Sequence, residues 1–117
     1  MQLHFRNQTG STIWVCIMFY SPDGCAYDGS WGTRGWWALG PNGGEAYVLN
    51  TDNDYAAFYA ESDEGEVWAG PYGPVYVHQS AFDSCVDIGD NSPETRIVGM
   101  RLVDLQHSDV HYVNLIN

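Results

Sequence analysis

Aromatic residues with polar neighbours are the side chains of this sequence best suited to bind a ligand. The segment "AYDGSWGTRG", residues 26–35, places two aromatic rings beside a carboxylate and a guanidinium group. An apolar face flanked by a few hydrogen-bonding groups is typical of ligand sites, and a carbohydrate-like ligand matches that arrangement. Three aromatic residues from elsewhere in the chain complete the predicted surface. The predicted ligand-binding residues are Trp14, Tyr27, Asp28, Trp31, Arg34, Trp37 and Tyr72.

Residues that could catalyse a reaction or hold a metal are few. His107 and His111 have a spacing found in metal sites, with Asp109 between them. However, "HSD" predicts a turn that separates the two imidazoles, and the wider ligand set of a zinc site is not visible. No G-x-S-x-G segment marks an activated serine. We therefore expect no enzyme activity, no metal and no cofactor.

Three cysteines allow one internal disulfide and leave one thiol. Cys16 lies in an apolar run, which predicts a small buried side chain. Cys25 and Cys85 lie in loop-like segments, so they are the predicted disulfide pair. The cysteine count does not fix the redox compartment.

The charge of the chain is strongly negative. Four Lys+Arg residues, all of them arginines, stand against 15 Asp+Glu, which gives a net charge of −11. Such a chain is repelled by nucleic acids and anionic membranes. The expected partner is therefore a protein or a carbohydrate and not a nucleic acid. No segment approaches the roughly 18 apolar residues of a membrane span, and residues 1–10 lack the layout of a secretion signal.

Carboxylates gather in three segments, "TDND", "SDEGE" and "DIGDNSPE". None of these segments has the spacing of a calcium-binding EF-hand loop. A looser calcium site built from two loops and a solvated acidic rim are the two interpretations that stay open.

The elements that would position these residues are β-strands. Turn signals such as "SPDG", "GPNGG" and "GPYGP" separate short runs rich in β-branched and aromatic residues. Only "HQSAFDSC" suggests a short turn of helix. The fold class is therefore all-β: a single-domain antiparallel β-sandwich or small barrel of eight or nine short strands over residues 1–117. The predicted strands cover residues 2–7, 12–20, 35–39, 45–49, 55–61, 66–69, 74–77, 96–105 and 110–116.

Two of the predicted strands are apolar on both faces. The run "TIWVCIMFY", residues 12–20, alternates between two sets of side chains that are both apolar, whereas a strand with one face in water alternates apolar with polar. Trp36 and Trp37 raise the same problem, since neighbouring side chains point to opposite faces. The expected cover for the second face is the long loop 20–34, another subunit or a ligand. We expect one indole of the pair in the core and the other beneath that loop, with an exposed binding platform as the alternative.

Several blocks of the chain resemble a known bacterial family. The blocks are "FRNQT" at 5–9, "GWWALGP" at 35–41, "AAFYAESDEGEVWAGPYGPVYV" at 56–77, "FDSC" at 82–85 and "VGMRLVD" at 98–104. In order and spacing they are similar to the domain-of-unknown-function family numbered one thousand and thirty-six. Within that pattern Trp36, Trp37 and Trp68 look like fixed structural points. A fainter similarity, "NQTGSTIWV" to thaumatin-like sandwiches, supports the fold alone.

The resemblance implies a compact β fold in proteins often exported from bacteria, and it supplies no activity. The family's disulfide framework does not carry over, because Arg6 and the "NGGE" turn replace two of its cysteines and another is absent near Val75. Only Cys85 falls at a family-like cysteine. The triplet Asn7-Gln8-Thr9 fits the N-glycosylation pattern, which in a bacterial protein we interpret as a chance match.

Three classes of function fit these features. The first is a non-enzymatic binding or assembly module, which uses aromatic surface for a partner subunit in a homo-oligomer or for a carbohydrate-like ligand. The second is a small acidic toxin or effector delivered to another cell. The third is an acidic inhibitor that mimics nucleic acid, with carboxylates at phosphate-like spacing along one face. We favour the first, and a location outside the producing cell over the cytoplasm.

Overall fold

Strands and turns make up the part of the chain that the computed structural model describes, residues 1–21, 25, 31–80, 82–85 and 95–116. For residues 84, 85 and 95 it describes the backbone alone. No helix long and apolar enough to cross a membrane occurs in these ranges. The strands are β1 (Gln2–Asn7), β2 (Ile13–Tyr20), β3 (Trp31–Leu39), β4 (Gly44–Asn50), β5 (Tyr55–Ser62), β6 (Val67–Trp68), β7 (Tyr72–His78), β8 (Phe82–Cys85), β9 (Thr95–Asp104) and β10 (Val110–Leu115).

These strands form two sheets, as the all-β prediction requires. The smaller sheet has the order β10-β1-β4, and the larger has the order β7-β9-β5-β2-β3-β8 with β6 beside β5. Neighbouring strands are antiparallel except β1 and β10, which are parallel. The sequence did not predict this parallel pair, since it joins segments from the two ends of the described chain.

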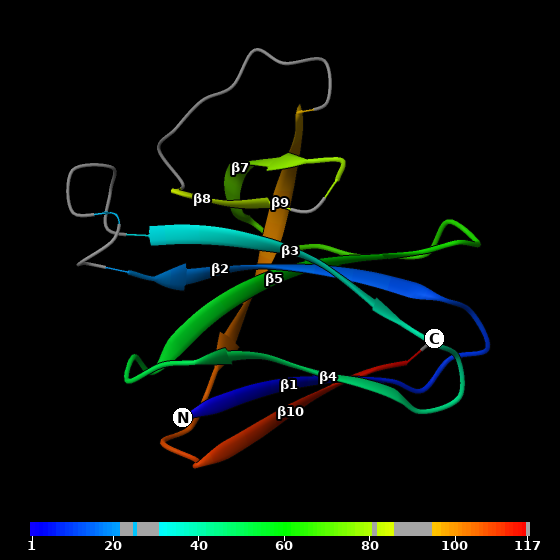
Figure 1. Ribbon diagram of the computed structural model, residues 1–117, viewed down its shortest axis with the longest axis horizontal. Helices are drawn as coiled ribbons and strands as arrows, with labels where there is room; N and C mark the ends of the chain where they lie inside the picture. The colour runs from blue at the N-terminus through cyan, green and yellow to red at the C-terminus, as the bar shows by residue number, and fades with distance from the viewer. Residues whose placement is uncertain (22–24, 26–30, 81, 86–94, 117) are drawn as a thin grey trace.

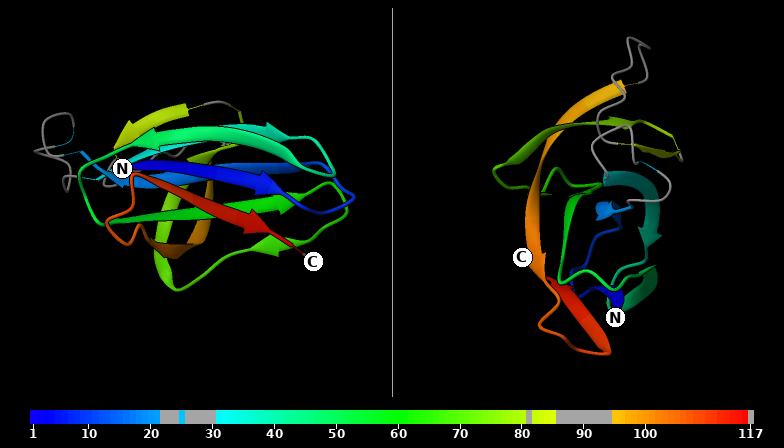
Figure 2. Two further views of the ribbon diagram at one scale, coloured as in Figure 1. Left: turned by 90° about the horizontal axis from the view of Figure 1, so that it is seen from below. Right: turned by 90° about the vertical axis from the view of Figure 1, so that its left-hand side faces the viewer.

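The larger sheet folds back over itself along β9. The C-terminal part of β9 pairs with β5, whereas its N-terminal part pairs with β7. The strand arches between the two partners (Figure 2), as long strands do when their right-handed twist accumulates into coiling. As a result β7, β8 and the upper part of β9 lie above the β3–β2–β5 layer, and the smaller sheet lies below it (Figure 1).

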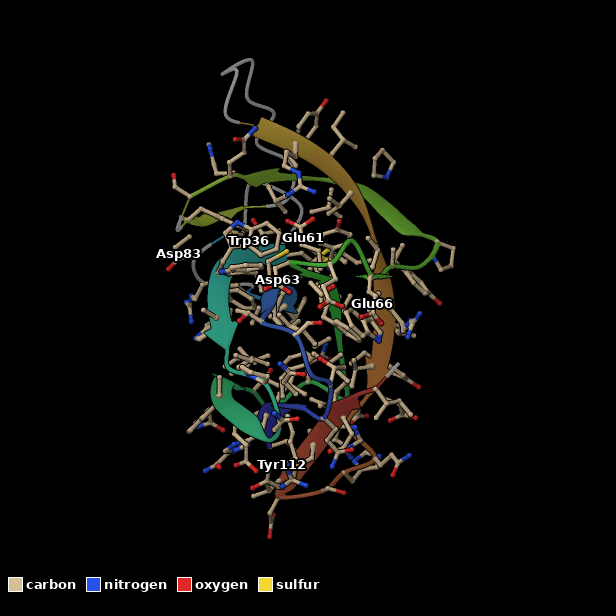
Figure 3. All side chains as sticks on the ribbon, turned by 90° about the vertical axis from the view of Figure 1, so that its right-hand side faces the viewer. Trp36, Glu61, Asp63, Glu66, Asp83 and Tyr112 are labelled. Atoms are coloured by element: carbon tan, nitrogen blue, oxygen red, sulfur yellow. The ribbon has the colours of Figure 1, made fainter. Side chains whose placement is uncertain are left out.

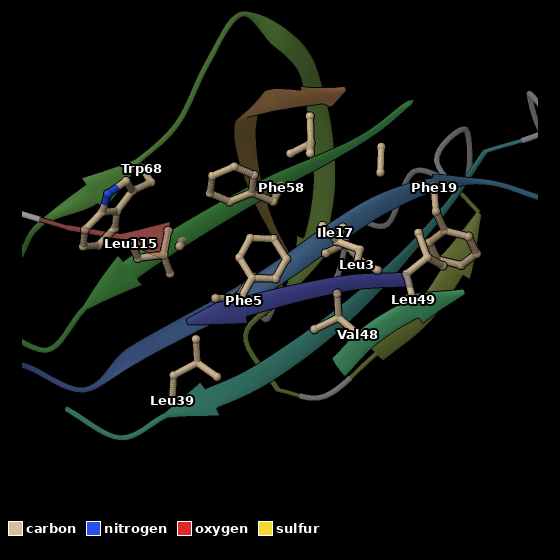
Figure 4. Close-up of a cluster of buried hydrophobic side chains, with 14 of the residues drawn as sticks. Leu3, Phe5, Ile17, Phe19, Leu39, Val48, Leu49, Phe58, Trp68 and Leu115 are labelled. Atoms are coloured by element: carbon tan, nitrogen blue, oxygen red, sulfur yellow. The ribbon is translucent and has the colours of Figure 1, made fainter. Parts of the chain in front are cut away.

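The main core fills the space between the two sheets (Figure 4). Side chains from β1 and β4 meet those of β2 and β5 there, and the rings of Phe5 and Phe58 pack edge to face with centroids 5.0 Å apart. Trp68 of β6 is also buried in this core. The odd-numbered residues of β2 supply one of its walls: Ile13, Val15, Ile17 and Phe19.

A second core lies inside the fold of the larger sheet. Cys16 of β2 and Tyr59 of β5 pack there against Val75 and Val77 of β7 and against Met100 of β9. Over Cys16, the apolar second face of β2 is thus covered by β7 and β9 of the same chain, whereas Tyr20 at the end of the strand is exposed. The sequence suggested a loop, a subunit or a ligand as the cover and did not indicate these two strands, because the pairing that curls the sheet joins residues far apart in sequence.

The adjacent tryptophans serve the two cores separately. Val15 pairs with Trp37 and Cys16 with Gly35, so Trp36 is the additional residue of a β-bulge. Trp37 packs against the main core and Trp36 against the second core. The Trp36 N–H donates a hydrogen bond of 2.7 Å to the carbonyl oxygen of His78, which ties β3 to β7. Both indoles therefore have a structural role.

Two predicted elements differ from the observed ones. β3 begins at Trp31 and not at residue 35, because the glycines of "WGTRG" allow close strand contact: a Cβ on Gly35 would lie 2.6 Å from Cys16 Cβ. The segment predicted as a turn of helix contains β8, which pairs with the edge of β3. An open strand edge offers backbone hydrogen bonds that the local sequence pattern does not reveal.

Candidate functional site: an aromatic groove

An open groove lies on the inner face of the folded sheet, beyond the end of the second core. Its volume is about 420 Å³. Met18 of β2, Ala57 of β5 and Leu102 of β9 form its floor, as cross-strand neighbours of one another. Because such neighbours point to the same side of a sheet, three adjacent strands present one continuous apolar surface.

Three aromatic rings stand around this floor. Trp31 comes from β3, Tyr55 from β5 and Tyr72 from β7. Tyr20 extends the rim, since its ring lies edge to face with that of Trp31 at 5.6 Å between centroids. The groove is thus lined by apolar and aromatic side chains from five strands, and the two tyrosine hydroxyls and the Trp31 indole N–H are the polar side-chain groups of its lining residues.

The groove contains two of the residues that the sequence predicts as ligand-binding, Trp31 and Tyr72. Trp37 packs against the main core. Trp14 lies on the same face of β2 as Met18 but pairs with Glu61, on the far side of Cys16. Tyr27 and Asp28 lie outside the described residues, so their place relative to the groove stays a prediction.

Arg34 lies on the opposite face of β3 from Trp31. Its Nε lies 3.3 Å from the Asp83 carboxylate, and its guanidinium carbon lies 4.9 Å from the ring centre of Phe19. Sequence reasoning placed Arg34 with Trp31 because the two are close in the chain. Residues three apart in a strand point to opposite sides.

Four lining residues were missed by the sequence analysis: Met18, Tyr55, Ala57 and Leu102. Their local patterns are those of ordinary strand residues. A signal was nevertheless present in the sequence. Leu102 and Val103 are neighbours that point to opposite faces of β9, and both are apolar, so this part of the strand is apolar on both faces. Only the strand pairing brings Leu102 opposite Ala57.

A polar cluster closes the other end of the second core. The guanidinium of Arg96 donates two hydrogen bonds to the Glu61 carboxylate, of 2.7 and 3.0 Å. The Tyr59 hydroxyl donates a third to Glu61, of 3.1 Å. The guanidinium carbon also lies 5.9 Å from the ring centre of Trp36 and 5.8 Å from that of Tyr59. Figure 3 shows Trp36 and Glu61 side by side at this end of the molecule.

This cluster shifts the pKa values of its members. The hydrogen bonds from Arg96 hold the pKa of Glu61 below its ordinary value, against the opposing effect of partial burial. Burial, followed by the charge of Glu61, raises the pKa of Tyr59. The cluster is therefore an ion pair at neutral pH, and its charges compensate each other.

Replacing Glu61 by glutamine should make stability less dependent on pH. A carboxyl whose pKa is lower in the folded than in the unfolded state stabilises the fold above its unfolded value, about 4.3, and this contribution is lost as pH falls through the folded value. We expect Glu61→Gln to lower the free energy of unfolding at pH 7 and to reduce the further loss between pH 5 and pH 3. Urea unfolding of both proteins at pH 7, 5 and 3 measures this.

Glu45→Gln is the matched control for that experiment. Glu45 forms an exposed pair with Arg6, at 2.6 Å, and exposed pairs contribute at most about 1 kcal/mol. The prediction is wrong if Glu61→Gln and the wild type lose the same free energy of unfolding between pH 5 and pH 3.

The cysteines have different states. Cys16 is a free thiol, fully buried in the second core, and burial raises its pKa far above the ordinary value. This confirms the predicted small buried side chain. Cys25 is disulfide-bonded. The Cys85 side chain lies outside the described part of the structure, so the pairing of Cys25 with Cys85 stays a prediction.

The histidines and carboxylates that the structure describes do not converge on one site. Among the described residues, no group of three or more His, Cys, Asp or Glu side chains is close enough to hold a metal ion. His107 Nδ1 lies 3.0 Å from the Asp54 carboxylate. His111 lines a second hollow, separate from the aromatic groove, between β9 and β10. Asp87, Asp90 and Glu94 of the acidic segment "DIGDNSPE" lie outside the described ranges, so the two-loop calcium site stays a prediction.

The architecture defines this protein as an all-β, two-sheet domain with an apolar groove inside its folded sheet. No protein-family model, curated protein or solved structure matches the chain. Membership of the bacterial family that the tryptophan blocks resemble accordingly stays a prediction, and function has to be argued from the groove itself.

Proposed function

We propose that this protein is a non-enzymatic binding module, and that its ligand site is the aromatic groove. The observation that carries the proposal is the combination of Trp31, Tyr55 and Tyr72 around an open apolar floor. Sites for small molecules have volumes of about 300–1,000 Å³ and are lined mainly by hydrophobic and aromatic side chains. The groove, at about 420 Å³, falls within that range.

Partial exposure of the lining supports the same proposal. Tyr55, Tyr72 and Leu102 keep about two fifths of their surface in water although each adjoins the buried residues of the second core. A ligand that covers these side chains removes apolar surface from water, which contributes about 25 cal/mol for each Å². The lining favours a ligand with an apolar body over one that needs many hydrogen bonds.

A neutral apolar dye provides the test. N-phenyl-1-naphthylamine fluoresces strongly when it leaves water, and we expect its titration with the protein to saturate at one dye per chain. Tyr72→Ala should weaken binding about five- to tenfold, because it removes one aromatic wall of the groove.

Tyr76→Ala is the matched control. Tyr76 lies on the same strand as Tyr72 and is exposed to a similar degree, 39% against 44%, but it does not line the groove. Equal effects of the two substitutions on the dye's Kd, or no saturable binding to the wild type, would contradict the proposal. Light scattering on the same samples checks whether Tyr72 contributes to self-association, the assembly form of this function.

The nucleic-acid mimic has less support than the binding module. A mimic needs carboxylates along one face, whereas the described ones are distributed over the layers of the fold. Glu45 is on the lower sheet, Asp63 follows β5 of the middle layer, and Asp83 is on β8 of the upper layer (Figures 1 and 3). The toxin hypothesis rests on composition alone.

A further inference from the structure

The inner face of the folded sheet carries two aromatic pairs, one at each end of the second core. At one end the rings of Trp36 from β3 and Tyr59 from β5 lie edge to face, the Arg96 guanidinium lies beside both, and the carboxylate of Glu61 pairs with it. At the other end, in the groove, the same two strands supply Trp31 and Tyr55. Both ends therefore carry a tryptophan from β3 and a tyrosine from β5.

A carboxylate residue lies opposite Tyr55 on the neighbouring strand. Asp104 is the cross-strand partner of Tyr55 and lies two residues beyond Leu102, on the same face of β9. Directly opposite side chains in an antiparallel pair have Cβ atoms about 5 Å apart. Asp104 therefore adds a negative charge near Tyr55, while its Oδ1 accepts a hydrogen bond of 2.8 Å from the Gln106 N–H of the following turn.

The groove differs from the Arg96 site in lacking a cation of its own. The sequence has no lysine, and all four arginines are within the described residues. Each arginine lies over a ring elsewhere: Arg6 over Tyr112, Arg34 over Phe19, Arg96 over Trp36 and Tyr59, and Arg101 over Phe58. Among the described contacts, no cation lies over Trp31, Tyr55 or Tyr72.

We infer that the groove binds a small organic cation, a quaternary ammonium group carried on an apolar body. This inference rests on the function proposed above and names the ligand class of the same site. Aromatic faces attract cations through the negative potential of the ring, and this attraction strengthens when water is removed. The net charge of −11 adds a general attraction for cations.

The quaternary form follows from the polarity of the lining. On the groove floor, a primary ammonium or a guanidinium would bury N–H donors against the side chains of Met18, Ala57 and Leu102, whose only acceptor is the weak thioether sulfur of Met18. Buried donors without acceptors are costly. A quaternary ammonium group has no N–H to satisfy, and its methyl groups suit an apolar floor.

A pair of compounds with the same shape tests the charge. Phenyltrimethylammonium and tert-butylbenzene differ in the positive charge, and both are small enough for the groove. Titrations followed by the indole N–H resonances should give a Kd about five- to thirtyfold lower for the cation. Trp31→Leu should reduce this preference, whereas Trp14→Leu, which removes a half-buried tryptophan outside the groove, should leave it unchanged.

The outcomes separate the inference from the function on which it rests. Equal affinities for the two compounds, both lowered by Trp31→Leu, would overturn the cation inference and leave the apolar binding site in place. No saturable binding of either compound to the wild type would overturn both. A preference for the cation that Trp31→Leu leaves intact would place the cation elsewhere and overturn the inference.

Discussion

Phe58→Ala should lower the free energy of unfolding by about 3–5 kcal/mol, the range for removing a buried phenylalanine ring. Phe58 is 2% exposed, and its ring packs edge to face against Phe5 at the centre of the main core. Ile17 lies beside it as a cross-strand neighbour on β2. Since domains of this size are stable by about 5–15 kcal/mol in total, the loss is a large fraction of the fold's stability. Urea unfolding at pH 7 measures it.

Phe58→Leu is the control, because leucine keeps much of the buried volume and should cost about half as much or less. If the alanine variant loses under 1 kcal/mol, the space between the two sheets is not the main core of this protein.

Asn7→Asp should lower the free energy of unfolding by about 3 kcal/mol or more near neutral pH, the range for an unpaired buried charge. Asn7 is fully buried at the end of β1. Its Nδ2 donates to the carbonyl oxygens of Ser11, Leu39 and Gly40 at 2.6, 3.1 and 3.0 Å. Its Oδ1 accepts from the backbone N–H and the hydroxyl of Thr9. An aspartate would turn a carboxylate oxygen toward three carbonyl oxygens.

The loss should grow with pH. Burial and the facing carbonyl oxygens raise the folded-state pKa of the introduced carboxyl above its unfolded value of about 3.9. The variant is therefore closest to the wild type below pH 4 and falls behind as pH rises through that value. Asn7→Ala is the control, since it removes the same hydrogen bonds without adding a titratable group, so its loss should not depend on pH. Equal losses for Asn7→Asp at pH 3.5 and pH 7 would contradict this account.

The same geometry bears on the Asn7-Gln8-Thr9 triplet. A glycan attaches to the side-chain nitrogen of asparagine, and in this fold that nitrogen is buried and bonded to three carbonyl oxygens. The side chain joins the end of β1 to the following turn and to the end of β3. Its place in the fold agrees with treating the sequence match as a coincidence.

Much of the secondary structure could be predicted from the sequence. Alternation over two residues and clusters of turn-forming residues are local signals, and they located nine of the strands, most of them to within one or two residues. β8 and the first part of β3 were missed. β8 is a short segment and the first part of β3 is rich in glycine, and each forms a strand only because it pairs with a neighbouring strand. Of the residues that line the candidate groove, the sequence singled out Trp31 and Tyr72, from residue type alone.

By itself, the sequence determined that the chain is all-β, that both faces of β2 are apolar, and that the side chains of two adjacent tryptophans point to opposite faces of a strand. Only the tertiary structure decided what provides the cover, since β7 and the N-terminal part of β9 fold over β2 through pairings between distant segments. It also decided which core each indole enters: Trp37 packs against the main core, and Trp36, at the bulge, against the second core. The groove depends on the same distant pairings, because its residues come from five strands and meet only when the sheet curls. The periodicity of apolar residues indicates which face of a strand is buried. The register between paired strands determines which side chains contact each other on that face.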